Sequence, residues 1–174
     1  MIIRQEQEKD YSAVFTLIES SFKHLQESDH KEQFLVERLR KSDAFIPELS
    51  LVAENEEKII GYILLSKVEI ISNDKKIITL ALAPIAVLPE YQRKGIGKAL
   101  IAEAHKRAIL SGYTSIVLLG HKDYYPQFGY RKASEFGIIF PFNVPDEYCM
   151  AIELLPDSLK DTHGIVHYSS VFFE

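Results

Sequence analysis

The chain has 174 residues, of which 47% are hydrophobic and 26% are charged, values that are ordinary for a soluble globular protein and exclude a disordered or membrane-embedded chain. The length suits a single domain, residues 1–174, that buries a substantial core. The formal net charge is −5, and residues 1–60 carry the whole acidic excess, with thirteen acidic and eight basic residues. This excess favours a cationic ligand on that part of the chain, or a solvated acidic surface.

Targeting and redox signals are absent from the sequence. The first ten residues, MIIRQEQEKD, carry charges where a signal peptide needs an apolar stretch, and no run approaches the ~20 apolar residues of a membrane helix. Cys149 is the single cysteine, which excludes an internal disulfide and a cysteine zinc cluster. We therefore expect a cytoplasmic protein with no membrane partner.

The first 50 residues predict one short strand and two helices. Ile2 and Ile3 begin the strand, and Asp10 is a candidate N-cap for a helix that ends near Phe22. This first helix carries apolar residues at helical spacing, namely Val14, Leu17, Ile18 and Phe22. A second amphipathic segment ends around Lys41 and carries Phe34, Leu35, Arg38 and Leu39.

Residues 50–54 and 59–71 predict two strands of a hairpin, joined by the polar sequence NEEK. The long apolar run over residues 77–88 lacks the alternation of a half-exposed strand, so we expect a central strand that is covered on both faces. Pro84 lies within this run, and proline cannot donate to a sheet ladder. We therefore expect a bulge there, with the strand parting from its neighbour.

A helix is predicted to begin at Gly95 and to end at Gly112, because Ile96, Leu100, Ala104 and Ala108 follow one another at four-residue spacing. Residues 114–119 predict another buried strand. Strand, helix and strand then form a βαβ unit whose ligand site lies at the carboxyl end of the strands. A short helical turn is expected before Gly129, and the remaining apolar segments, 136–140, 149–154 and 165–173, predict antiparallel pairing.

The turn before this helix, QRKGIGK, has the properties of an anion site. A helix that opens on glycine presents bare N–H groups and a partial positive charge, and the turn holds three cations and no acid. Two nucleotide motifs are excluded. A P-loop fails because Gln92 and Ala99 replace its first glycine and its Ser/Thr, and a dinucleotide fingerprint fails because Leu100 replaces its third glycine.

The pattern Gln-x-x-Gly-x-Gly, at Gln92, Gly95 and Gly97, follows a strand ending in AVLPEY and resembles the GCN5-related N-acetyltransferase (GNAT) family. A second match, YYPQFGY over residues 124–130, follows about 28 residues later. The segments IVLLGHKDYYPQFGYRKA, PDEYCMAIEL and GIVHYSSVFF resemble the YhbS-like branch. The resemblance covers most of the chain and implies an α/β (α+β) fold, with a mixed central sheet of about six to seven strands, a splayed and bulged central strand, and flanking helices.

The resemblance also implies acetyl-CoA as co-substrate and no metal. Glycines in the turn remove the Cβ atoms that would keep phosphate oxygens from the backbone. The residues that the resemblance assigns to CoA are the pantetheine contacts Ile85, Ala86 and Val87 and the pyrophosphate turn Gln92, Arg93, Lys94, Gly95, Ile96, Gly97, Lys98 and Ala99.

The general-acid tyrosine of the family aligns with Tyr125, which would protonate the departing thiolate, while Tyr124 is a packing neighbour. Both tyrosines are alternatively core aromatics. No ionisable residue lies between residues 77 and 89, so the general base stays open between a water relay and His121. The backbone N–H of Ala86 or Val87 is a candidate oxyanion donor.

The expected function is transfer of the acetyl group of acetyl-CoA to an amine of a small molecule or protein. The alternative is a non-catalytic module that binds or senses acyl-CoA. Glu27 and Asp29 are candidate acids on the acceptor side. His163 and His167 share a strand face without a third ligand, so a metal site is not expected. No nucleic-acid partner is expected, and a homodimer is compatible with the sequence.

Overall fold

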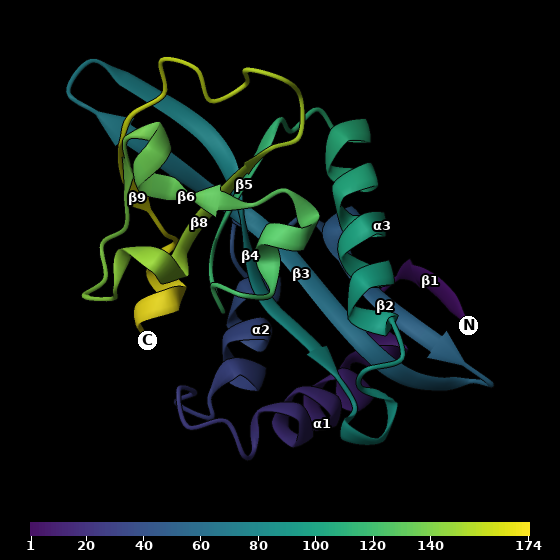
Figure 1. Cartoon of the computed structure of the whole chain (residues 1–174). Helices are drawn as coiled ribbons and strands as arrows, with labels where there is room; N and C mark the ends of the chain where they lie inside the picture. Colours follow the sequence, from purple (N-terminus) through teal and green to yellow (C-terminus); the bar gives the residue numbers. More distant parts are fainter. The chain divides into compact units, whose positions relative to one another are not determined.

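The computed structural model describes all 174 residues (Figure 1). The residues form two compact units. The first contains Met1–Ser66, Ala83–Arg107 and Val171–Glu174, and the second contains Lys67–Leu82 and Ala108–Ser170. None of the helices combines the length and the apolar character that crossing a bilayer requires.

The first unit begins with antiparallel strands in the order β1-β2-β3, where β3 continues into the second unit. Their bounds are Ile2–Gln5 for β1, Ser50–Asn55 for β2 and Lys58–Ser72 for β3. The predicted hairpin is therefore confirmed, and its turn consists of Glu56 and Glu57, both in the left-handed region with φ of 49° and 64°. A register shift lies between Ala53 and Glu54.

Helices α1 (Tyr11–Phe22) and α2 (Glu32–Arg40) lie side by side in this unit, as Figure 1 shows. The helical spacing of Val14, Leu17 and Ile18 puts all three side chains on one face, and all three are buried. They share a core with residues of α2 and of the strands, including Val36, Leu39, Val52, Tyr62 and Leu64. Burying each large aliphatic side chain contributes about 1.5–3 kcal/mol relative to leaving it exposed.

Tertiary contacts set two local features of this unit. Phe34 is 45% exposed, because the buried face of α2 consists of Gln33, Val36 and Leu39. Its ring instead lies edge-on to Phe15, with 5.3 Å between the centroids. Asp10 does precede α1, but its carboxylate caps no N–H of that helix and is bound by Arg4 and by the N–H of Gln7.

A buried polar network joins α2 to the strands. Arg40 forms an ion pair with Glu6, and the Glu6 carboxylate also accepts a hydrogen bond from Ser50 Oγ at 2.7 Å. Ser50 Oγ lies 2.8 Å from the hydroxyl of Tyr62, which is fully buried. Every charged group of the network therefore has a partner, as buried charges require.

The second unit is a mixed sheet in the order β3-β4-β5-β8-β6, and β9 pairs with both β3 and β7. The strands β4 and β5 are parallel, with Leu80 opposite Ile116 and Ala81 opposite Val117. Only the pairing of β7 with β9 is also parallel; the ladders β5-β8, β6-β8 and β3-β9 are antiparallel. The bounds are Lys75–Val87 for β4, Ser115–Leu119 for β5, Arg131–Lys132 for β6, Ile138–Ile139 for β7, Cys149–Glu153 for β8 and Gly164–His167 for β9.

The fold class is confirmed, while the chain has nine strands rather than six or seven. The difference comes from β6 and β7, whose two residues each are too few to leave a pattern in the sequence. The central strand β4 runs through Pro84, and the peptide bond between Ala83 and Pro84 is cis. The bulge expected at Pro84 stays a prediction.

Helix α3 (Ile96–Leu110) agrees with the predicted helix. Gly112 ends it with φ of 87°, and the N–H of Gly112 donates to the carbonyl of Ile109 at 3.0 Å. Ile96, Leu100 and Ala104 are buried, as the four-residue spacing predicts.

Candidate active site

The turn between β4 and α3 leaves the first N–H groups of the helix available. The first helical hydrogen bond runs from Ala99 N–H to the carbonyl of Gly95 at 3.0 Å. The N–H groups of Ile96, Gly97 and Lys98 precede it and have no acceptor within the helix. Gly95 has φ of 81°, and a Cβ built there meets no atom within 4 Å. This geometry can accommodate an anion.

Gly61 of β3 allows α3 to begin close to the sheet. A Cβ at Gly61 would lie 3.0 Å from both Ile96 Cγ2 and Leu100 Cδ1, so a larger residue would push the start of α3 outward. The anchoring of the turn therefore depends on a residue more than thirty positions earlier in the chain. The sequence does not single out Gly61, because an isolated glycine in a strand gives no sign of what approaches it.

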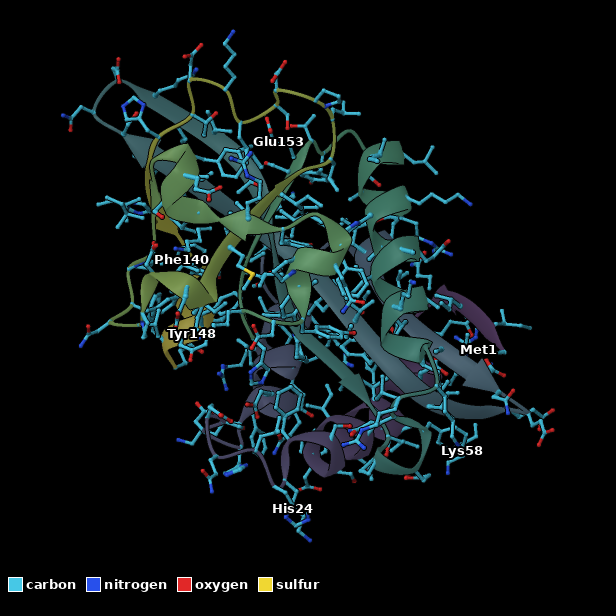
Figure 2. The ribbon with its side chains drawn as sticks, in the orientation of Figure 1. Met1, His24, Lys58, Phe140, Tyr148 and Glu153 are labelled. Carbon is cyan, nitrogen blue, oxygen red and sulfur yellow. The ribbon has the colours of Figure 1, made fainter.

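Cations surround the turn. Arg93, Lys94 and Lys98 are exposed, and Lys94 Nζ lies 5.3 Å from the ring centre of Tyr91. Lys58, labelled in Figure 2, reaches the same ring from the β2-β3 hairpin at 5.2 Å and also pairs with Glu90 at 3.1 Å. Two positive charges therefore lie over this ring, beside the glycine turn.

Hydrogen bonds to the carbonyl of Val87 hold the end of β4, where the glycine turn begins. Gln92 Nε2 donates to this oxygen at 3.1 Å, and Ser21 Oγ of α1 donates to it at 3.0 Å. The next N–H, of Leu88, donates to the carbonyl of Ile60 at 3.0 Å. Ser21 was not a sequence-based candidate, because nothing in the pattern of α1 indicates which distant carbonyl its hydroxyl meets.

Tyr125 lies in the second unit and is only 7% exposed. It begins the predicted short turn, Tyr125–Phe128, which ends at Gly129 in the left-handed conformation. Its ring lies edge-on to those of Tyr124 and Tyr130, with centroids 5.1 and 5.8 Å apart. Burial, together with the neighbouring Tyr124, raises the pKa of Tyr125 above its ordinary value, so its hydroxyl stays protonated at neutral pH.

Gly120 makes room for this ring. A Cβ at Gly120 would lie 2.2 Å from Tyr125 Cε2, a distance that carbon atoms do not reach without displacement of the ring. The glycine follows β5 directly, and its N–H donates to the carbonyl of Tyr148 at 3.0 Å. The position of Tyr125 therefore requires glycine at residue 120.

The weaker sequence candidates lie on the surface. His121 is exposed, and its backbone carbonyl accepts the N–H of Tyr124 at 3.1 Å. Glu27 and Asp29 are exposed in the segment between α1 and α2. His163 and His167 are exposed, and no three His, Cys, Asp or Glu residues of the chain are arranged to hold a metal ion.

The predicted site residues fall into two groups. The residues assigned to CoA belong to the first unit. Ile85–Val87 are the last residues of β4, and Gln92–Ala99 form the turn that follows and the start of α3. Tyr125 belongs to the second unit.

The sequence and the structure are similar to known acetyltransferases. The model of the Acetyltransferase (GNAT) domain family matches residues 47–132. The uncharacterized N-acetyltransferase YhbS of Escherichia coli K12 is 31% identical over 173 residues, which are 99% of this chain and 98% of YhbS. The uncharacterized N-acetyltransferase YjhQ of the same organism is 35% identical over 119 residues, which are 68% of this chain and 66% of YjhQ.

Two solved structures share the fold over nearly the whole chain. The crystal structure of Escherichia coli YhbS in complex with CoA has a TM-score of 0.89 and 27% identity, covering 99% of this chain and 92% of that one. A GNAT family acetyltransferase from Brucella melitensis in complex with acetyl-CoA has a TM-score of 0.81 and 30% identity, covering 98% and 97%.

The mostly antiparallel α/β sheet and the glycine turn at the start of α3, together with these relatives, define an acyltransferase. The chain belongs to the GCN5-related N-acetyltransferase family, in its YhbS-like branch. The predicted family and enzyme class are thereby confirmed.

Proposed function

We propose that this protein transfers the acetyl group of acetyl-CoA to an amine of a small molecule or a protein by direct attack, with Tyr125 as general acid. One observation carries the proposal: the N–H groups of Ile96, Gly97 and Lys98 have no acceptor within the helix, and a Cβ at the preceding Gly95 meets no atom within 4 Å. A diphosphate fits such a helix start, because its oxygens accept several N–H groups at once. The CoA and acetyl-CoA complexes of the two relatives support the assignment.

The two groups of residues assigned to CoA would bind different parts of the molecule. The turn Gln92–Ala99 binds the pyrophosphate, with Arg93, Lys94 and Lys98 adding positive charge, and the main chain of Ile85, Ala86 and Val87 binds the pantetheine arm. Because the Val87 carbonyl already accepts two hydrogen bonds, we infer that Val87 contributes its N–H group instead. This N–H, or that of Ala86, would stabilise the oxyanion.

The reaction needs one proton donor at the sulfur. The amine nitrogen attacks the thioester carbonyl carbon, and the tetrahedral intermediate collapses by breaking the carbon–sulfur bond. The Tyr125 hydroxyl gives its proton to the departing thiolate, while the amine releases its proton to water. The ordinary tyrosine pKa of 10.0 already keeps this hydroxyl protonated at neutral pH, so the proton is in place before the step.

The acceptor is predicted to be cationic, because residues 1–60 carry the whole acidic excess of the chain. The test is to incubate the protein with acetyl-CoA and a panel of polyamines, aminoglycosides, simple monoamines and lysine peptides. Thiol release and product mass are then measured together. We expect acceptor-dependent thiol release with a gain of one acetyl group on a cationic amine. CoA binding without release for any amine would support the acyl-CoA-binding module instead.

A further inference from the structure

We propose that Ser21 of α1 is a positioning residue for the CoA site. Its hydroxyl donates to the carbonyl of Val87 and so holds the end of β4, which leads into the glycine turn. The inference rests on the proposed function, since it assumes that the turn Gln92–Ala99 binds CoA.

The hydroxyl of Ser21 bridges two elements that are distant in sequence. Its oxygen lies 2.7 Å from the carbonyl oxygen of Leu17 in the same helix and 3.0 Å from that of Val87. A hydroxyl has one proton, so the two carbonyls share it in a three-centre hydrogen bond. The bond to Leu17 is the local one that serines in helices often make. The bond to Val87 spans 66 positions and ties α1 to the end of β4.

The Val87 carbonyl also accepts a hydrogen bond from the side chain of Gln92, which follows it in the chain. Gln92 Nε2 lies 3.1 Å from the Val87 oxygen, so one acceptor joins the last residue of β4, the turn and α1. The N–H of the same peptide group, that of Leu88, donates to the carbonyl of Ile60 and fixes this peptide against β3. The peptide group at the strand end is therefore held on both sides, by side chains at its carbonyl and by the sheet at its N–H.

This arrangement gives Ser21 a role that does not involve contact with CoA. Val87 is only five residues before Gln92, so a displacement of the strand end shifts the N–H groups that begin at Ile96. Removing the Ser21 hydroxyl leaves Gln92 as the one side chain on the Val87 carbonyl. The turn then adopts its binding geometry in a smaller fraction of molecules, which weakens the apparent affinity by that fraction.

The first experiment measures CoA affinity by titration calorimetry, and KM and kcat with acetyl-CoA, for Ser21→Ala. Ser20→Ala is the matched control, because the neighbouring Ser20 hydroxyl makes only the local bond, to Thr16 at 2.8 Å. We expect Ser21→Ala to weaken CoA binding and raise the KM for acetyl-CoA about fivefold, the effect of one hydrogen bond, with kcat changed less than twofold. Ser20→Ala should match the unaltered protein.

Two further variants separate the hydroxyl from the shape of the side chain. Ser21→Thr and Ser21→Val have the same shape, and only threonine keeps the hydroxyl. We expect Ser21→Thr to bind CoA more tightly than Ser21→Val, at equal melting temperatures within about 2 °C. This comparison also serves if Ser21→Ala does not fold.

A double-mutant cycle with Gln92→Ala measures the coupling between Ser21 and Gln92 in CoA affinity, which a general loss of stability would not change. If both side chains act through the Val87 carbonyl, Ser21→Ala should weaken CoA binding by a different factor in the Gln92→Ala background. Purely multiplicative effects, or equal affinities of Ser21→Ala and Ser20→Ala, would overturn the inference. Failure of the unaltered protein to bind CoA would instead overturn the proposed function.

Discussion

Tyr125 owes its position to the aromatic residues around it. The edge-on contacts with Tyr124 and Tyr130 fill the space around its ring, and the absence of a side chain at Gly120 leaves room for it. The same burial raises its pKa, because an ionised phenolate loses its hydration there. The packing of the ring and its raised pKa thus have one structural cause.

Replacement of this tyrosine tests its chemical role without disturbing the packing. Tyr125→Phe keeps the ring and removes the proton donor, so we expect kcat to fall about 100-fold or more while CoA affinity stays within about twofold. Tyr124→Phe is the control, since this half-exposed neighbour has no assigned role in the chemistry. Steady-state kinetics and calorimetry measure the two effects. Unchanged turnover in Tyr125→Phe would remove it from the mechanism.

At the scale of the element, the two ends of α3 offer an internal comparison. Gly95 precedes the helix and Gly112 follows it, with φ of 81° and 87°, and a Cβ at either position meets no atom within 4 Å. Alanine at either position therefore introduces similar backbone strain, of about 1 kcal/mol. The positions differ in one respect, because only Gly95 adjoins the predicted pyrophosphate site.

We expect Gly95→Ala and Gly112→Ala to lower the free energy of unfolding by similar amounts. Only Gly95→Ala should weaken CoA binding, by about tenfold or more, because its Cβ occupies the space that the phosphate oxygens need. Denaturant unfolding and CoA titration of both variants provide the measurements. Equal CoA affinities for the two would mean that the pyrophosphate does not approach this turn.

A cluster of ion pairs stabilises the connection between β1 and α1. Arg4 contacts Asp10 at 2.7 Å and Glu54 at 2.6 Å, and the Asp10 side chain is almost fully buried. The hydrogen bond from Arg4 is the largest cause that holds the pKa of Asp10 below its ordinary value of 3.8. The folded protein therefore keeps Asp10 ionised at a pH where the unfolded chain already takes up a proton.

This lowered pKa predicts how stability depends on pH. The contribution of Asp10 is fully present above about pH 5 and is lost as the pH falls through the lower pKa of the folded state. We expect Asp10→Asn to lower the free energy of unfolding by about 2 kcal/mol at pH 7 and by progressively less below pH 4. Urea unfolding across this range measures the difference, with Glu8→Gln, an exposed acid nearby, as control. A difference that does not change with pH would contradict this explanation.

At the scale of the whole molecule, features set by neighbouring residues could be predicted from the sequence. The glycine turn, the ends of α3 at Gly95 and Gly112, and the β2-β3 hairpin follow from local spacing and turn residues, and the structure confirms them. Contacts between distant residues could not be predicted. Ser21 on Val87 and Gly61 under Ile96 depend on how the chain folds back, which no local pattern encodes.

The placement of side chains in the predicted helices has the same origin. The second predicted helix carries Phe34 and Leu35, yet its buried face accepts Gln33 and leaves Phe34 against Phe15. Asp10 is a residue type that often caps helices, but its carboxylate instead accepts the stronger charge-assisted hydrogen bonds from Arg4. In both cases a tertiary contact overrides a local preference.

The central claim is that the turn between β4 and α3 binds the pyrophosphate of CoA, and a crystal structure of this protein with CoA tests it most directly. We predict phosphate oxygens within about 3 Å of the N–H groups that begin at Ile96, with the pantetheine arm beside Ile85–Val87. Such a structure would also show whether Glu27 or Asp29 lies near the thiol. A pyrophosphate bound elsewhere, with no oxygen in reach of these N–H groups, would contradict the claim.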